Sequence, residues 1–484
     1  MKKIRLLPLF LAFLMLAMLL VSCSDNADDK GGTNTTVAGV DNEEPTETTN
    51  ALSTVEVNNY DGYLYSIIVT NQDKRHVDFV AESETGATLN DLVFRRNMKI
   101  EDMYNITITA QDMDFGTVSS TAQKDAVAAD SSHSLYVSNA TAYSLASAGH
   151  LYPVNTMPGI NLENPWWDQD AIAGMSVKDT TFLVTGDITP TGLLTSECVL
   201  FNKKLFDNKT IAYPYDTAFD GKWTLDAMTG IAKGLTEDIN GDSKINKNDD
   251  MFSMTCWFDF GHAMFYGAGA RMVSKDSDDI PYLDWNIDNY AAIYEKIYAL
   301  VIGTEANYEK SDHEGSFKVF HEGRAYFCGI TFQKIELFLR DMNDDYGVLP
   351  LPKFSENQER YVTDVSGAGS MCIWPVSLKE AETVGNITEA LAAASYDSIT
   401  PSLFNVIASV KNVRDEESAQ MVQLIIRNRV FDMAHMYGIT GDNFVWDQLA
   451  KKATEVASYF DPKKSAAEKA LDKIVTAFIE NTNA

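Results

Sequence analysis

The chain has 484 residues, with 39 Lys and Arg against 69 Asp and Glu, and a formal net charge of −30. A surface this acidic repels phosphate backbones, which argues against nucleic acid as a partner. Apolar residues make up 45% of the chain and aromatic residues 11%. That is enough for a large core and for two domains rather than one.

The N-terminus has the pattern of an export signal. Lys2, Lys3 and Arg5 precede an apolar run over residues 6–21, and the letters LVSC end at Cys23. A basic start before a short apolar segment is typical of a secretory signal. The ending resembles a bacterial lipobox, in which the cysteine becomes the lipidated first residue of the mature protein. Residues 1–22 are then the signal peptide, and their removal takes away three positive charges, so the net charge moves from −30 to −33. The alternative is a plain signal peptide with an incidental cysteine.

Residues 23–59 are predicted to form a disordered tether. Residues 24–59 contain no aromatic side chain and are dominated by Asp, Asn, Thr, Glu, Gly and Ala. Such a segment buries too little apolar area to offset its ordering entropy. The folded part is predicted to begin near Tyr60.

Strands and helices alternate after Tyr60. Aromatic and β-branched runs predict strands at 63–70, 106–109, 134–137, 181–184 and 198–201. Helices are predicted at 90–103, 143–151 and 289–301, and from Leu378 onward the chain is predicted to be mainly helical, closing with 464–481. This alternation predicts an α/β fold with mostly parallel sheets.

The helix predicted at 289–301 carries an apolar stripe. Its residues at i, i+3 and i+4 spacing are Tyr290, Ile293, Tyr294, Ile297, Tyr298 and Val301. We interpret the stripe as core packing rather than as a ligand site.

The segment 238–249 matches an EF-hand-like calcium loop. Oxygen-bearing side chains stand at positions 1, 3, 5, 9 and 12, and position 7 offers a backbone carbonyl. The predicted ligands are Asp238, Asn240, Asp242, Lys244 through its carbonyl, Asn246 and Asp249. Calcium takes six to eight oxygen ligands, which requires this density of carboxylates and amides. Ser243 stands at position 6, where Gly usually supplies the turn, and the alternative is an acidic solvent loop with Asx turns.

Enzyme signatures are missing from the sequence. It has no HExxH, GxSxG, GxxxxGK[ST] or GxGxxG motif. Carboxylates are plentiful, but no feature selects two of them as an acid/base pair. Cys198, Cys256, Cys328 and Cys372 lack the CxxC spacing of a zinc site. One disulfide and buried free thiols both remain open for them.

Seven short segments are informative through their order and spacing. They are LASAGHLYPV at 145–154, NPWWD at 164–168, LVTGDI at 183–188, FNKKLF at 201–206, GKWTLD at 221–226, FHEGRAYF at 320–327 and YGVLPLPK at 346–353. Each alone is weak. Together they resemble the extracellular solute-binding proteins of bacterial ABC importers, of the carbohydrate type called family 1, across about 60–480.

This resemblance implies an α/β, two-lobed, periplasmic-binding-protein-like fold with a hinge and an interlobe ligand cleft. We place the crossovers near 190–198 and 350–358, with a third hinge near 400–408. Lobe one then comprises 60–193 with 356–405, and lobe two comprises 194–355 with 406–484.

The resemblance also implies a function. The expected protein is a non-catalytic lipoprotein on the extracytoplasmic face of the membrane, which captures an oligosaccharide and delivers it to ABC permease subunits. A surface carbohydrate-active enzyme or a lectin-like adhesin is the alternative, and a peptide-binding importer component differs only in its ligand.

Candidate ligand contacts follow from the same resemblance. Sugar rings present an apolar face edged with hydroxyls, so a sugar site pairs aromatic platforms with polar side chains. Thr195 stands where some members carry an acidic sugar ligand. The expected contacts are Asn139, Thr141 and Tyr143 in the first cleft loop, then Thr195, Thr331, Phe332, and the two tryptophans Trp257 and Trp374.

Overall fold

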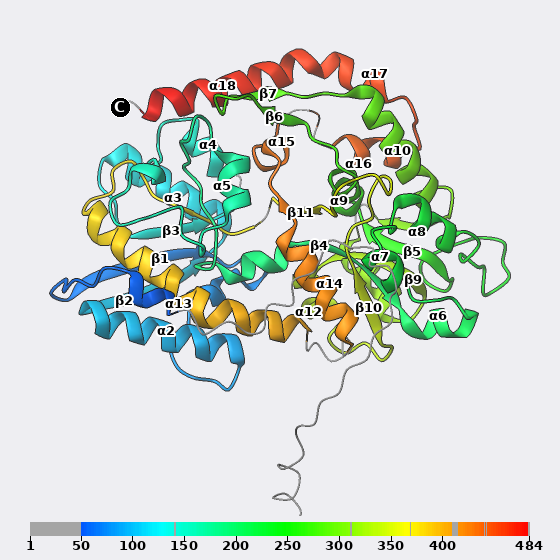
Figure 1. Ribbon diagram of the computed structural model, residues 1–484, viewed down its shortest axis with the longest axis horizontal. Coiled ribbons are helices and arrows are strands. Elements are labelled where there is room, and N and C mark those ends of the chain that lie inside the picture. The colour runs from blue at the N-terminus through cyan, green and yellow to red at the C-terminus, as the bar shows by residue number, and fades with distance from the viewer. Residues whose placement is uncertain are drawn as a thin grey trace, which may run out of the picture. The chain divides into compact units, whose positions relative to one another are not determined.

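Two mixed sheets organise the chain in a computed structural model (Figure 1). The structure describes residues 50–139, 142–309, 312–367, 369–408, 415–439, 441 and 443–482. The four-stranded sheet has the order β12-β3-β1-β2 and the five-stranded sheet the order β10-β4-β9-β5-β8. The strands are β1 Tyr63–Thr70, β2 Ile106–Met113, β3 Leu135–Ser138, β4 Glu197–Asn202, β5 Phe252–Trp257, β6 Val273–Lys275, β7 Pro281–Leu283, β8 Asn307–Glu309, β9 Ala325–Thr331, β10 Tyr346–Leu349, β11 Thr363–Asp364, β12 Met371–Ile373 and β13 Arg429–Val430.

Helices cover both sheets. The α-helices are α2 Thr88–Tyr104, α3 Phe115–Ala128, α4 Tyr143–Ala146, α5 Gln169–Met175, α6 Lys203–Lys209, α7 Tyr215–Phe219, α8 Leu225–Ala232, α9 Asp259–Gly267, α10 Ile287–Val301, α11 His313–His321, α12 Phe332–Phe338, α13 Ala381–Ala408, α14 Glu416–Arg427, α15 Met433–Met436, α16 Phe444–Lys451, α17 Val456–Phe460 and α18 Lys464–Thr482. The 3-10 helices are η1 Ala51–Thr54, η2 Gln72–Asp78, η4 Val154–Thr156, η5 Pro190–Thr195 and η6 Asp461–Lys463. None of the helices in the described residues is long and apolar enough to cross a membrane.

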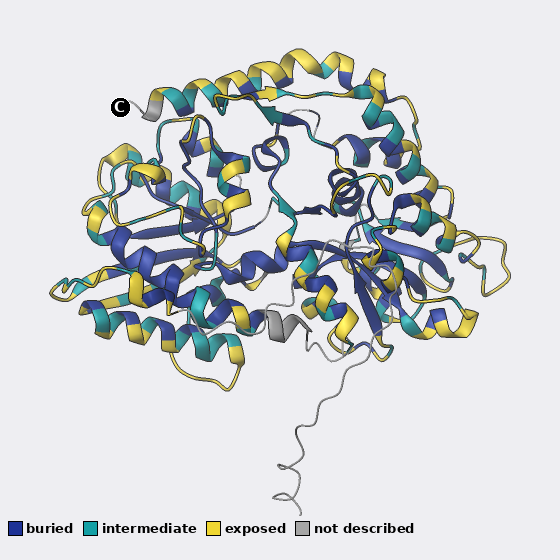
Figure 2. Ribbon diagram, viewed as in Figure 1, coloured by how far each residue is buried: buried dark blue, intermediate teal, exposed yellow. Residues whose placement is uncertain are grey.

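The four-stranded sheet is parallel except for β12. β1 pairs in parallel with β2 and β3, whereas β12 runs antiparallel to β3. Side chains alternate across β1, so that Tyr65, Ile67 and Val69 pack toward α2 and α13 while Ile68 packs toward α3. β3 and β12 are buried along their length and β1 over most of it (Figure 2), whereas the edge strand β2 is largely exposed or half-buried.

The five-stranded sheet combines both strand directions. β5 is parallel to β8 and β9, and β4 is antiparallel to β9 and β10. Cys198 and Leu200 face a core shared with α11, α12 and α14, and Val199 and Phe201 face a core shared with α8, α9 and α10. This sheet is therefore a layer between two sets of helices, as the alternation in sequence predicts.

Most predicted elements are present, with shifts at their ends. The strand predicted at 63–70 is β1. The helix predicted at 289–301 is α10, and its apolar stripe packs into the core. The helix predicted at 143–151 ends at Ala146. Residues 181–184 form an isolated bridge between Val184 and Cys372 instead of a strand, because the loop makes one antiparallel contact and then turns away.

The predicted tether needs a correction at its end. Residues 1–49 lie outside the described part of the chain. Ala51 and Leu52 are buried and donate their backbone N–H groups to the carboxylate of Asp397, over 2.9 and 3.1 Å. Ordered structure therefore begins before Tyr60, because a helix more than 300 residues later supplies these contacts.

The NPWWD segment is anchored through its indoles. Trp166 and Trp167 donate their Nε1–H groups to opposite oxygens of Glu389 on α13, at 3.0 and 2.8 Å. Both rings are buried, so this carboxylate compensates the polar atoms that the rings carry into the core. The tryptophan pair is a structural feature of this side of the four-stranded sheet.

The chain passes between the sheets in neighbouring segments. Ser196 forms an antiparallel bridge with Val365, and the Ser366 N–H donates to the Thr195 carbonyl at 3.3 Å. The predicted crossover at 350–358 falls in a segment that packs beside α8, where the Leu225 N–H donates to the Lys353 carbonyl. The first and second passages thus lie side by side at 195–196 and 365–366.

Candidate ligand-binding site

One edge of the five-stranded sheet gathers several polar side chains. The parallel strands β5 and β9 end there at Trp257 and Thr331, and the antiparallel strand β4 begins there, with Glu197 opposite Thr331. In open α/β sheets, ligands bind outside the carboxyl ends of the strands. We call this place the strand-end site.

Glu197 is a buried acid at the strand-end site, with 4% of its surface exposed. Burial raises the pKa of this carboxyl to about 8, Asp259 and Asp364 raise it further, and Lys334 and His435 oppose the rise. Below that pH the carboxyl is protonated, so it can both donate and accept hydrogen bonds.

Asp259 brings a second acid to the same edge from the first turn of α9. Burial raises the pKa of its carboxyl, while Lys334, His262 and His435 partly offset the rise. A helix N-terminus favours negative charge, so this acid and Glu197 have different environments although they lie close enough to affect each other.

Two histidines join α9 to the second passage between the sheets. The rings of His262 and His435 lie 4.4 Å apart between centroids. The Gly367 N–H donates to Nε2 of His435 at 3.2 Å. α15, which carries His435, is therefore bonded to the segment that links the sheets.

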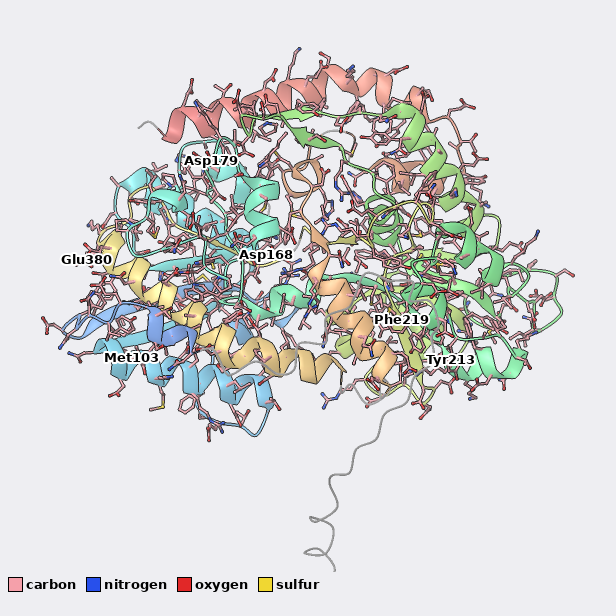
Figure 3. All side chains as sticks on the ribbon, viewed as in Figure 1. Met103, Asp168, Asp179, Tyr213, Phe219 and Glu380 are labelled. Atoms are coloured by element: carbon pink, nitrogen blue, oxygen red, sulfur yellow. The ribbon has the colours of Figure 1, made fainter. Side chains whose placement is uncertain are left out.

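A second set of charges lies beside the passages. Asp168, labelled in Figure 3, caps the N-terminus of α5 by accepting from the Ala171 N–H at 2.9 Å. Its other oxygen forms an ion pair with Arg429 of β13. Nearby Asp187 is half-buried. Desolvation of its carboxyl raises its pKa to about 7, and a hydrogen bond with Thr400 and the charge of Arg429 oppose that rise. Segments from both sheet regions thus hold charges against one another here.

Three predicted contacts lie at the strand-end site. Thr195 is almost fully buried and donates its hydroxyl to the Gly192 carbonyl at 2.7 Å. Thr331 caps α12, accepting from the Lys334 N–H at 3.4 Å. Phe332 is buried in the core shared with α11 and α14, and its N–H donates to the Ser196 carbonyl at 3.3 Å. Strand pairing brings these residues together, and their role toward a ligand stays a prediction.

Trp257 is half-buried at the end of β5. The Lys334 ammonium lies 4.8 Å from the centre of its ring system, in cation–π geometry. Phe258 meets the indole at 4.3 Å between centroids. The Lys334 ammonium therefore covers one face of this indole.

The predicted contacts from the first cleft loop follow β3 of the other sheet. Asn139 is buried and donates from Nδ2 to Oε1 of Gln72 at 3.4 Å. Tyr143 is half-buried, and its ring lies 5.3 Å from that of Tyr437, just after α15. Thr141 lies outside the described residues. Tyr143 thus reaches the segment that also carries His435.

Trp374 lies apart from these residues. It is fully buried in the core between the four-stranded sheet and α13, and its carbonyl accepts from the Tyr152 N–H at 2.8 Å. No ring face of Trp374 is exposed to a ligand in this structure. The platform predicted there has no geometric support.

The 238–249 loop adopts a turn compatible with the calcium motif. Asp238 accepts from the Gly241 and Ser243 N–H groups, each at 2.7 Å, and Asn240 and Asp242 each accept from the residue two positions later. Ser243 has a φ of 66°, the left-handed conformation that Gly usually supplies at position 6. The serine therefore does not prevent the turn.

The ends of that loop are held by a residue that the motif does not include. Asp250 is fully buried and accepts from the Ile239 N–H at 3.0 Å and the Asn246 N–H at 2.8 Å. Asp249 is exposed and accepts from Nδ2 of Asn240 at 2.9 Å. Within the described residues no group of three or more His, Cys, Asp or Glu side chains is arranged to hold a metal. Calcium binding stays a prediction, with Asp238, Asn240, Asp242, Lys244, Asn246 and Asp249 as its ligands.

Five charged residues of the strand-end site were not predicted. They are Glu197, Asp259, Lys334, Asp364 and His435, of which the last two are far along the chain from the strands that they approach. Glu197 had a signal, because a lone charge at the start of an apolar strand requires compensation when buried.

Known structures share this fold. A cyclo/maltodextrin-binding protein complexed with maltotetraose matches 86% of this chain and 96% of its own, at 14% identity and a TM-score of 0.54. An ABC transporter solute-binding protein from Thermotoga lettingae, bound with α-D-tagatose, matches 86% and 100%, at 14% identity and 0.52. The GacH receptor of Streptomyces glaucescens, solved unliganded and with acarbose, matches 87% and 98%, at 13% identity and 0.51.

No protein-family model matches the chain, and no curated protein matches it significantly in sequence. The structural matches establish the fold, which is the mixed α/β fold of periplasmic binding proteins. The predicted fold class is therefore confirmed.

Proposed function

We propose that this protein is the solute-binding receptor of an ABC importer and captures a carbohydrate, an oligosaccharide, at the strand-end site. The observation that carries the proposal is a cluster of buried polar groups at the strand ends of a periplasmic-binding-protein fold. Side chains whose pKa values are shifted by burial and by neighbouring like charges cluster at functional sites. The fold is shared with binding proteins, which favours capture over catalysis.

The chemistry of the strand-end site suits a ligand rich in hydroxyl groups. A protonated Glu197 and a carboxylate at Asp259 supply both kinds of hydrogen-bonding partner to a hydroxyl. Trp257 offers an aromatic surface beside them, once Lys334 moves off its ring. The cluster contains acids as well as a lysine and histidines, so a charged ligand would be repelled by some of these side chains. A neutral polar ligand is repelled by none of them.

Capture by this fold requires contact with both sheet regions. Ligand favours a closed arrangement only through its differential affinity for that arrangement. The residues best placed on the second side are Tyr143, which packs against Tyr437, and Asn139 at the end of β3. We propose lobes close to the predicted 60–193 with 356–405 and 194–355 with 406–484, with their boundaries moved to the passages at 195–196 and 365–366.

The anchor is part of the proposal and rests on sequence. Cys23 closes the LVSC segment, so the mature chain is proposed to be lipid-anchored on the extracytoplasmic face, beside its permease subunits. Each buried acyl methylene contributes about 0.8 kcal/mol to membrane affinity. Cys23→Ala is expected to move the protein from the membrane fraction to the soluble fraction or to block its processing. Unchanged membrane retention in this variant excludes the anchor without affecting the ligand site.

The function is tested by binding, with a glycan panel that includes maltotetraose and α-D-tagatose. Calorimetry is expected to show saturable binding of one panel member, and small-angle scattering a smaller radius of gyration in the complex. Thermal stabilisation without bond cleavage supports a receptor. Cleavage of the glycan identifies the alternative, a carbohydrate-active enzyme, and binding of peptides alone identifies a peptide receptor.

Paired variants locate the site. Asp259→Asn removes the acid at the first turn of α9, whereas Asp288→Asn removes an exposed acid from the first turn of α10. We expect Asp259→Asn to weaken sugar binding about tenfold, the loss of a hydrogen bond to a charged group, and Asp288→Asn to bind as the unaltered protein. Equal affinities for the two variants place the ligand elsewhere.

A further inference from the structure

Two tight turns from different parts of the chain meet away from the passages between the sheets. Val177 pairs with Thr180 around a two-residue turn, in which Lys178 and Asp179 have φ of 50° and 61°. Positive φ at both central positions defines a type I′ turn, which favours Asn-Gly. Lys-Asp is a poor sequence for it, so the conformation has to be supported from outside the turn.

The support comes from Asp279 at the tip of the β6–β7 hairpin. Its carbonyl accepts from the Lys178 N–H at 3.0 Å, and its Oδ2 accepts from the Asp179 N–H and the Ser176 hydroxyl, each at 3.1 Å. Asp279 itself has a φ of 57°. Strained backbone conformations of this kind persist only where surrounding contacts hold them in place. They cluster at ligand clamps and at switch regions.

Lys275 reinforces the contact from the same hairpin. Its Nζ lies 3.0 Å from Oδ1 of Asp279 and donates to the Ser176 hydroxyl at 2.8 Å and to the Ala173 carbonyl at 2.5 Å. Its side chain is 17% exposed, so these interactions are only partly screened by solvent. One ammonium thus joins the hairpin to the end of α5.

α18 adds an apolar part to this contact. Phe478 is fully buried, and its ring meets that of Phe182 edge to face at 4.7 Å between centroids. α18 also packs along β7, and Figure 1 shows the helix running beside the hairpin. Figure 3 labels Asp179 on the turn at the α5 side of this contact.

The two sides of the contact belong to different sheet regions. Residues 176–182 lead into Val184, which bridges to Cys372 beside the four-stranded sheet. The β6–β7 hairpin leads into α10, which packs on α8 and α9 of the five-stranded sheet. The sheet regions are therefore joined at these turns as well as at the passages and through the contact of Tyr437 with Tyr143.

We propose that the hairpin tip 275–280 and Phe478 of α18 form a clasp, which must open before ligand enters or leaves the strand-end site. This inference rests on the proposed function, because it assigns the movement to ligand exchange. Lobes joined only at their crossovers separate by bending there. A second, non-covalent connection adds contacts that every opening has to break, so it slows release and gives ligand-free protein a smaller open population.

Hydrogen exchange and small-angle scattering of the ligand-free protein test the clasp directly. Asp279→Ala removes the carboxylate that holds the 176–180 turn, and Asp278→Ala removes an exposed neighbour on the same tip. We expect Asp279→Ala to accelerate amide exchange over 176–180 by about three- to tenfold, the loss of side-chain hydrogen bonds, and to increase the radius of gyration. Asp278→Ala is expected to leave both unchanged.

A second variant covers the case in which Asp279→Ala fails to fold. Lys275→Gln keeps the length of the side chain and removes its charge, and a smaller change in the same direction is expected. If the folded variants match Asp278→Ala in both exchange and scattering, the clasp does not exist.

Release kinetics then connect the clasp to function, with maltotetraose as the probe. The clasp controls ligand exchange if maltotetraose dissociates faster from the Asp279→Ala variant while its association rate constant for open molecules is unchanged. Identical dissociation from both variants removes the clasp from ligand exchange. If the panel contains no ligand, the proposed substrate class fails, while the exchange and scattering results still decide whether the clasp holds the sheets together.

Discussion

Two buried acids, one beside each sheet, have raised pKa values for different reasons. Asp78 at the end of η2 is fully buried and accepts from the Thr191 N–H at 3.0 Å and from its hydroxyl at 2.5 Å, with Arg96 and Arg75 nearby. Its pKa rises to about 7 through burial, against the effect of those partners.

Glu197 has a different environment. Its pKa rises to about 8 through burial, and the acids Asp259 and Asp364 add to the rise. An acid bonded to backbone and hydroxyl donors stabilises its surroundings, whereas an acid placed beside other acids is costly to the fold. Such placements are typical of ligand sites, so the comparison separates a structural acid from a candidate functional one.

The largest expected effect comes from breaking the structural member of this pair. Asp78→Ala leaves two buried donors of Thr191 without their acceptor and removes the carboxylate beside two buried arginines. We expect the free energy of unfolding to fall by about 3–5 kcal/mol, measured by denaturant titration. Asp112→Ala, an exposed acid on β2, is the control and should leave it unchanged. A loss no larger than that of the control contradicts the structural role.

The acids of the 238–249 loop are exposed to solvent and add a third environment to the comparison of the two buried acids. They accept mainly from backbone N–H groups of their own turn, so calcium is expected to stabilise the fold by using their remaining lone pairs. Calcium at about 100 times its dissociation constant adds about 2.7 kcal/mol. Asp238→Ala should abolish the calcium-dependent rise in melting temperature, whereas Asp216→Ala on α7 should retain it. Identical melting with calcium and with chelator leaves a solvated acidic loop.

Local sequence patterns predicted the helices and strands far better than they predicted the contacts between distant residues. β1 spans the predicted 63–70 because a run rich in aromatic and β-branched side chains carries its own signal, and α10 follows its apolar stripe. The order at Ala51 depends on Asp397, a contact that no local pattern records. The isolated bridge at Val184 likewise depends on Cys372.

The candidate site divides in the same way. Thr195 shortly precedes β4, Trp257 and Thr331 end β5 and β9, and Phe332 follows β9, so these residues were predictable from position along the chain. His435 reaches the site through its bond from Gly367, 68 residues earlier, and only the packing of α15 reveals it. Trp374 has the same sequence character as Trp257, and burial against α13 rather than any difference in sequence separates them.

A smaller effect is expected from the aromatic surface beside Glu197. Trp257 and Trp446 both pack on Phe258, at 4.3 and 4.8 Å, and Trp257 also contacts Lys334 at the strand-end site. Trp257→Ala is expected to weaken sugar binding by about 1–3 kcal/mol through loss of apolar contact, and Trp446→Ala to preserve it. Calorimetry with the sugar identified in the panel measures both. Equal losses indicate a shared structural effect through Phe258 instead of a platform.

The smallest expected effect is a change in pH dependence at Glu197. Because the pKa of Glu197 is raised to about 8 in the folded protein from its ordinary value of 4.5, the folded protein binds more protons than the unfolded chain between those values. Stability from this group is therefore fully present below pH of about 4.5 and is lost as pH rises through about 8. Glu197→Gln mimics the protonated form, so its melting temperature should fall less steeply between pH 5 and pH 8.

Part of the slope should remain in Glu197→Gln, because Asp78 and Asp187, each with a pKa of about 7, titrate in the same window. The control is Glu309→Gln. Glu309 lies on the edge strand β8 and forms an ion pair with Lys247, and this variant should keep the full slope of melting temperature against pH. An unchanged slope in Glu197→Gln means that the carboxyl is ionised in the folded protein. Glu197 would then be a compensated charge like Asp168 with Arg429, and the distinction between the two buried acids would disappear.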